Sequence, residues 1–174
     1  MINFQQNYFE LFGLQPRFHL DLPQLDAAYR GIQSRVHPDK FVRAGDAERR
    51  VSMQSAAQAN EAYRTLKIPL ARARYLLALH QVDVQSESNT AMPAEFLLQQ
   101  MQWRESVEAA ADRPGELARL ALRLGRELQE RYSQFERQLD TRGDYAHAAG
   151  LVRELMFLER LREEIGDALE RSEA

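Results

Sequence analysis

The sequence predicts an all-α protein in two parts, a helical hairpin followed by an antiparallel three-helix bundle. Apolar residues recur at helical spacing along nearly the whole chain, and no segment has the alternating pattern of a strand. Only 8 Gly and 6 Pro interrupt the 174 residues. A polar stretch without helical periodicity, residues 81–90, divides the chain. We therefore expect domains at residues 1–75 and 93–174, joined by a connecting helix and linker at residues 76–92.

The first part should begin with a short helical segment and a long helix. Residues 8–14 have room for one or two turns that end at Gly13. The long helix should follow Asp21, whose side chain can cap it in a capping box with Gln24. Its apolar face comprises Leu25, Tyr29, Ile32 and Val36. Pro38 must end this helix, because proline has no N–H to donate.

A second long helix should begin near Asp46 and complete the hairpin. Its apolar stripe comprises Ala56, Ala59, Tyr63 and Leu66. The small alanines would let two antiparallel helices approach closely. A further helix should run over residues 70–79, just after Pro69.

Three helices follow the linker. One should run from Pro93 to about Ala111, and the next should carry an apolar stripe from residue 117 to residue 139. A turn is expected at residues 141–144, and the last helix carries a stripe over residues 148–169. Because short connections join antiparallel neighbours, these helices should form a bundle.

The composition excludes several classes of function. The chain has no cysteine, which rules out disulfides, thiolate metal sites and a cysteine nucleophile. Its four histidines are scattered, so we expect no metal and no cofactor. The N-terminus lacks the features of a secretory signal, and no apolar run approaches the ~20 residues that span a bilayer. We expect a cytoplasmic protein that does not bind membranes.

The charge is distributed unevenly. Residues 1–75 hold 11 Lys+Arg and 7 Asp+Glu, a balance of +4, whereas residues 76–174 hold 12 and 19, a balance of −7. Opposite signs suggest two surfaces for two partners. Ordinary solvated helix faces would give the same counts, and charge alone leaves both interpretations open.

The turn of the hairpin carries the tetrapeptide His37, Pro38, Asp39 and Lys40. Pro38 stiffens the turn, which lowers the cost of ordering it on binding. Asp39 offers two acceptor oxygens, which suit an arginine of a partner. Positive residues surround it at Arg30, Arg35, Lys40 and Arg43. This surface could attract an acidic partner.

A catalytic interpretation of His37 and Asp39 is weaker. A dyad needs mutual geometry and a pocket that excludes water, and these residues lie on an exposed loop. No serine or threonine nucleophile motif lies near them. We expect no catalytic residue and no enzymatic activity.

A second candidate surface lies on the first helix of the bundle. On a helical wheel, Leu97, Met101 and Leu98 fall about 100°, 140° and 200° from the expected core residue Phe96. On the last helix, Phe157 lies about 120° off the apolar stripe. Such residues suit an adaptable protein-binding patch. Periodicity alone leaves packing of the bundle against the hairpin equally open.

Several segments resemble known co-chaperones. Residues 8–14 (YFELFGL), 37–40 (HPDK) and 59–66 (ANEAYRTL) resemble the helices and loop of J-domains, over residues 1 to about 75. Residues 69–80 (PLARARYLLALH), 96–101 (FLLQQM) and 155–158 (LMFL) extend the resemblance over the whole chain. The chain is thus similar to the bacterial form of the HscB family, J-domain co-chaperones of iron–sulfur cluster assembly.

This resemblance implies an L-shaped protein with two partners. The J-domain would stimulate the ATPase of the DnaK-class chaperone HscA through residues 37–40, Arg30 and Arg35. The bundle would bind the scaffold protein IscU and deliver it to HscA. The implied scaffold site comprises Leu97, Leu98, Met101, Glu105 and Phe157. Family members tend to have acidic residues where this chain has Gln102 and Ala109, so the polar part of the contact differs here.

Two rival functions remain at this point. One is a general J-protein that delivers another client. The other is a nucleic-acid binder that uses the positive part of the chain, although the sequence lacks the interleaved aromatic and basic residues of such proteins.

Overall fold

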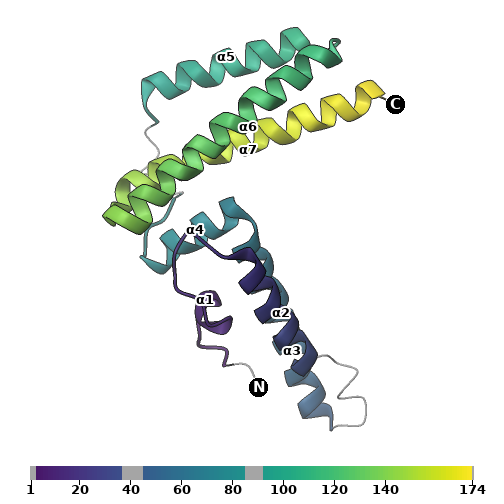
Figure 1. The fold of residues 1–174 in the computed structure, drawn as a ribbon, viewed down its shortest axis with the longest axis vertical. Coiled ribbons are helices and arrows are strands. Elements are labelled where there is room, and N and C mark those ends of the chain that lie inside the picture. Colours follow the sequence, from purple (N-terminus) through teal and green to yellow (C-terminus); the bar gives the residue numbers. More distant parts are fainter. Residues whose placement is uncertain (1–2, 37–44, 85–91, 174) are drawn as a thin grey trace. The chain divides into compact units, whose positions relative to one another are not determined.

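The computed structural model describes residues 3–36, 45–84 and 92–173, and these residues form helices and no strand (Figure 1). The all-α prediction is confirmed. The chain divides into two compact units, Met1–Leu76 and Leu77–Ala174, and the division falls inside helix α4 (Pro69–Leu79). No described helix combines the length and the hydropathy that crossing a membrane requires.

The first unit begins with a short helix, α1 (Tyr8–Leu11). Asn7 caps its start in a capping box. Gly13, at φ +67°, closes its end as expected, since this backbone conformation is unfavourable for other residues. The Tyr8 N–H donates to the Tyr75 hydroxyl at 2.9 Å, and the two rings stack at 4.4 Å. These contacts attach α1 to α4.

Helices α2 (Leu22–Val36) and α3 (Asp46–Lys67) form the expected antiparallel hairpin (Figure 1). The Asp21 carboxylate accepts a hydrogen bond from the Gln24 N–H at 3.1 Å, which confirms the predicted cap. Leu25, Ile32 and Val36 are buried, and each full burial of such a side chain contributes roughly 1.5–3 kcal/mol. The facing stripe of α3 is buried at Ala59, Ala62 and Leu66.

A polar network joins the two helices beside this core. The rings of Tyr29 and Tyr63 stack at 4.0 Å, and the Tyr63 hydroxyl donates to Asp26 at 2.8 Å. The Lys67 ammonium lies 3.5 Å from the same carboxylate. The hydrogen bond from Tyr63 holds the pKa of Asp26 below its ordinary value, and Lys67 and Arg30 lower it further against an opposing effect of desolvation.

We expect Asp26→Asn to lower the melting temperature at neutral pH but not in acid. Because the pKa of Asp26 is lower in the folded chain, its carboxylate adds stability above the ordinary pKa of 3.8 and loses that effect as the pH falls through the folded-state pKa. Melting curves of wild type and variant should therefore converge in acid. An unchanged difference between the two curves from neutral to acid pH would contradict this role.

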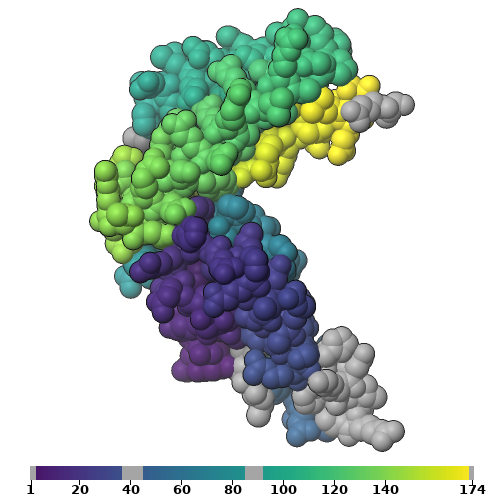
Figure 2. Space-filling view, in the orientation of Figure 1, coloured from purple at the N-terminus to yellow at the C-terminus, as the bar shows by residue number. Residues whose placement is uncertain are grey.

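The second unit contains the expected antiparallel three-helix bundle. Helix α5 (Ala94–Ala110) runs one way, α6 (Pro114–Glu136) returns, and α7 (Tyr145–Glu173) runs back beside α6 (Figure 1). Side chains fill the spaces between these ribbons (Figure 2). The largest fully buried side chains of the unit are Trp103, Phe135, Leu77, Leu117, Leu124, Leu155, Leu158 and Leu161.

The connection between α6 and α7 lies within the expected turn at residues 141–144, but helical hydrogen bonding extends into its first two residues. Helical hydrogen bonding continues through a π-helical turn, Arg137–Arg142, and the chain reverses only at Gly143. Gly143 has φ +65°, which lets the chain leave the helix there, and the Asp144 N–H bonds the Gln138 carbonyl at 3.0 Å. The wider π-helical turn keeps Leu139 buried before the chain turns.

Candidate partner-binding surfaces

The exposed face of α2 is positively charged. Arg30 and Arg35 are both exposed, and the Arg35 Nε donates to the Gly31 carbonyl at 3.2 Å. Asp26, the acidic residue of this helix, is engaged by Tyr63 and Lys67. The two arginines therefore determine the sign of the surface. The remaining residues predicted for this site, at positions 37–40, lie outside the described residues.

A buried serine fixes the end of α2, which directly precedes the HPDK motif in the sequence. The Ser52 hydroxyl, on α3, donates to the Val36 carbonyl at 2.7 Å. Val36 is the last residue of α2, so this bond attaches the helix end to its neighbour. Ser52 and Ser55 precede Ala59 by seven and four residues on the same stripe of α3. The apolar pattern of the sequence does not include these serines, because serine gives no apolar signal, although their spacing from Ala59 places them on the stripe.

Helix α5 exposes three large apolar side chains, which we call the α5 patch. The exposed fractions are 47% for Leu97, 61% for Leu98 and 59% for Met101. Phe96 and Trp103, on the same helix, are buried. Within the second unit, α5 thus buries one side and leaves an apolar side uncovered. A contiguous apolar patch of this kind is typical of a protein-binding surface.

Phe157, the remaining apolar residue of the predicted scaffold site, has a structural role as well. It is half-buried on α7, and its ring meets that of Phe96 edge-on at 5.9 Å and 87°. Such aromatic pairs add roughly 0.5–1.5 kcal/mol beyond the area they bury. Phe157 therefore belongs partly to the core, which its position on a helical wheel did not reveal.

We expect Phe157→Ala to lower the free energy of unfolding by about 1–3 kcal/mol, because it leaves Phe96 without its aromatic neighbour. Leu98→Ala should change that free energy by less than ~0.5 kcal/mol, because Leu98 is exposed. Urea unfolding of both variants measures the difference. Equal losses of stability would mean that Leu98 is also packed in the core.

Polar contacts fix the rotation of α5 and so the direction of its patch. The Trp103 indole N–H donates to the Glu127 carboxylate at 3.2 Å, and the Gln99 amide donates to its other oxygen at 2.5 Å. The Arg123 guanidinium lies 4.5 Å from the centre of the Trp103 ring. Because these partners lie on α6, α5 cannot rotate without breaking them. Glu105, predicted as a polar contact of the scaffold site, is exposed farther along the same helix.

A hollow of about 580 Å³ opens beside the α5 patch and is lined in part by Leu98 and Gln102. Arg131 and Glu154 also line it and form an ion pair at 3.0 Å. Burial raises the pKa of the Glu154 carboxyl, and Arg131 opposes that shift. The hollow gives a partner side chain space and polar groups next to the patch.

Among the described residues, no group of three His, Asp or Glu side chains is arranged to hold a metal ion. The candidate sites that the structure describes are two surface patches, one on α2 in the first unit and one on α5 in the second unit.

Comparisons with known proteins agree on one family. Residues 92–166 match the family model described as the HSCB C-terminal oligomerisation domain. The co-chaperone protein HscB homolog of Burkholderia thailandensis is 53% identical over 99% of this chain and 99% of its own. The chaperone HscB from Vibrio cholerae is 34% identical, with a TM-score of 0.85 over 96% of this chain and 99% of its own. The human co-chaperone protein HscB shares the fold, with a TM-score of 0.88, 24% identity, and coverage of 94% of this chain and 82% of its own.

Proposed function

This chain belongs to the HscB family of co-chaperones, and on that premise we propose that it brings the iron–sulfur scaffold IscU to the ATPase chaperone HscA. In this proposal the first unit is a J-domain that stimulates ATP hydrolysis by HscA. The second unit holds IscU. The chain itself catalyses no reaction, needs no metal or cofactor and acts in the cytoplasm during the maturation of iron–sulfur proteins.

The observation that carries the proposal is the α5 patch. Three large apolar side chains lie uncovered on a different unit from the one that bears the HPDK motif. Separate surfaces allow both partners to be bound at once. Tethering would raise the effective concentration of the scaffold near the ATPase without any contact between the two sites.

The J-domain surface supports the HscA half of the proposal. Arg30 and Arg35 on α2 would steer an acidic surface of HscA toward the loop. Asp39 would then offer its carboxylate to a basic group of HscA. A ligand shifts an equilibrium between two conformations only if it binds one of them more tightly. Asp39 must therefore bind the conformation of HscA that hydrolyses ATP more tightly than the other conformation.

The test is the steady-state ATPase rate of HscA with this chain, with IscU, and with both. We expect stimulation by the chain alone and a larger, synergistic stimulation with both. No stimulation by the chain would contradict the J-domain function. Stimulation without synergy, combined with no binding of purified IscU, would favour a general J-protein with another client.

One observation favours a second candidate for the α5 patch. The matching family model is described as an oligomerisation domain, so the patch could join two copies of the chain. Light scattering at micromolar concentration distinguishes the two cases. A monomer mass of 20.1 kDa supports the scaffold site. A dimer that Leu98→Ala dissociates would assign the patch to self-association.

A further inference from the structure

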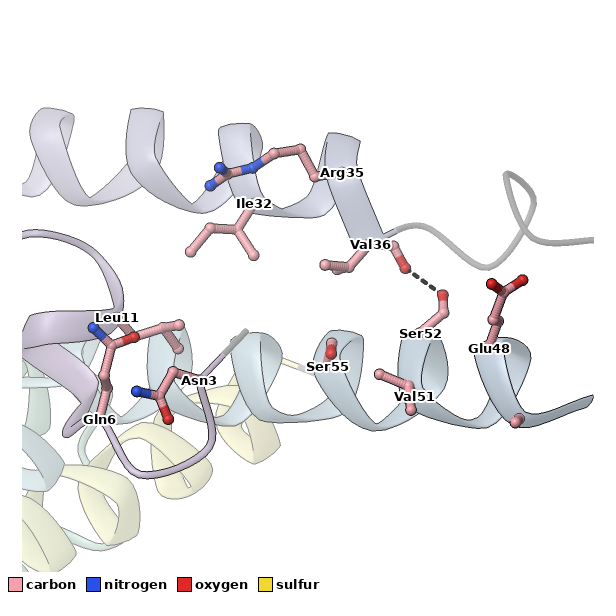
Figure 3. A pocket seen from close by; sticks show the side chains of 11 residues that line it. Asn3, Gln6, Leu11, Ile32, Arg35, Val36, Glu48, Val51, Ser52 and Ser55 are labelled. Atoms are coloured by element: carbon pink, nitrogen blue, oxygen red, sulfur yellow. Dashed lines mark hydrogen bonds between the residues drawn. The ribbon is translucent and has the colours of Figure 1, made fainter. Parts of the chain in front are cut away.

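A cavity of about 530 Å³ lies within the first unit, between α2, α3 and the N-terminal segment (Figure 3). Ile32 and Val36 point from α2 toward α3, and Ser55 points from α3 toward α2. Leu11 and Val51 extend the apolar wall. The function proposed above does not use this space.

Ser55 is the unusual residue of the cavity. It is only 1% exposed, and its hydroxyl has no hydrogen-bond partner among the residues that the structure describes. Ser52, one turn earlier, uses its hydroxyl to hold the Val36 carbonyl. Buried hydroxyls are nearly always paired, because burial removes the water that would otherwise bond them. The unpaired hydroxyl therefore points to a polar group that enters the cavity from outside the chain.

The rim of the cavity connects it to the surface proposed to face HscA. Arg35 lines the cavity and is also one of the two exposed arginines of α2. Val36, the last residue of α2 and the one before the HPDK motif in the sequence, also lines it. Glu48 lines the cavity too, so its rim carries both charges, and an acidic segment attracted by Arg30 and Arg35 would meet the cavity on its Arg35 side.

We infer that this cavity receives an amphipathic side chain, of the kind that tyrosine has, from an acidic segment of the ATPase partner. Its apolar body would pack between Ile32 and Val51, and its polar tip would hydrogen-bond the Ser55 hydroxyl. Acidic neighbours on the same segment would meet Arg35. An anchor of this kind adds apolar contact to an interface that otherwise depends on charge, and buried aromatic anchors dominate many interfaces. The inference rests on the proposed function and identifies the anchor of its HscA contact.

Two substitutions of Ser55 and one neighbouring control test the anchor in the full-length chain. Ser55→Leu fills the cavity, whereas Ser55→Ala leaves it open and removes only the hydroxyl. Gln54→Leu adds the same leucine to an exposed position of α3, outside the set of residues that line the cavity. The readouts are the concentration of each variant that gives half-maximal stimulation of HscA, and its melting temperature.

We expect Ser55→Leu to raise the half-maximal concentration at least about tenfold and Ser55→Ala about two- to fivefold, with Gln54→Leu like wild type. Both Ser55 variants should melt at or above the wild-type temperature, because one fills an open space and the other removes an unpaired hydroxyl. If Ser55→Leu and Ser55→Ala both gave half-maximal stimulation at the same concentration as wild type, the inference would be overturned. A lower melting temperature of Ser55→Leu would overturn it too, because the chain itself would then occupy the space. A wild-type chain that gave no stimulation would instead refute the proposed function.

Discussion

Asp39→Asn should abolish stimulation of the HscA ATPase and leave the fold intact. Asparagine has nearly the same size and shape but lacks the negative charge and presents one amide group in place of an acceptor oxygen. An arginine that bonds both carboxylate oxygens would lose one of its two acceptors. Truncating one partner of a buried, hydrogen-bonded charge pair costs roughly 2–5 kcal/mol, so the stimulated rate should fall by more than about tenfold at equal concentration.

The measurement is phosphate release by HscA at saturating ATP, with melting curves to verify folding. Asp112→Asn is a suitable control, because Asp112 is an exposed aspartate between α5 and α6, in the other unit. It should stimulate as wild type does. A folded Asp39→Asn variant that retained wild-type stimulation would refute the J-domain mechanism, whatever the bundle binds.

The helices could be predicted from sequence because helix formation depends on local patterns. The apolar period located the core of α2 at Leu25, Ile32 and Val36, and all three are buried. The cap at Asp21 and the end at Gly13 depend on side chains and backbone angles within a few residues. Such features require no knowledge of the tertiary fold.

Features that depend on neighbouring helices were not predictable in this way. A helical wheel gives the direction of Phe157 from its own helix, but not the presence of Phe96 beside it. Ser52 and Ser55 are buried because α2 covers them, whereas their residue type alone favours an exposed position. Helical hydrogen bonding after α6 also continues to Arg142, two residues into the expected turn, and the chain leaves the helix at Gly143.

The α5 patch gives the other large expected effect. Replacing Leu97, Leu98 and Met101 together by Ala should weaken binding of IscU by about two to four powers of ten. Apolar anchors at the centre of an interface often cost more than ~1–2 kcal/mol each when truncated, and three such losses add to roughly 3–6 kcal/mol. Phe157 is excluded from the set because its contact with Phe96 would combine a loss of stability with a loss of binding.

Titration of IscU against the triple variant, paired with its melting curve, separates binding from folding. The three side chains are about half exposed or more, so their loss should leave the melting temperature nearly unchanged. If they were core residues, each truncation would cost ~2–5 kcal/mol of stability and the variant would unfold far below wild type. A stable variant with wild-type affinity would exclude the patch as the scaffold site. The hollow beside the patch would then be the surface of the bundle to test next, because Arg131, Glu154 and Gln102 still line it when Leu98 is truncated.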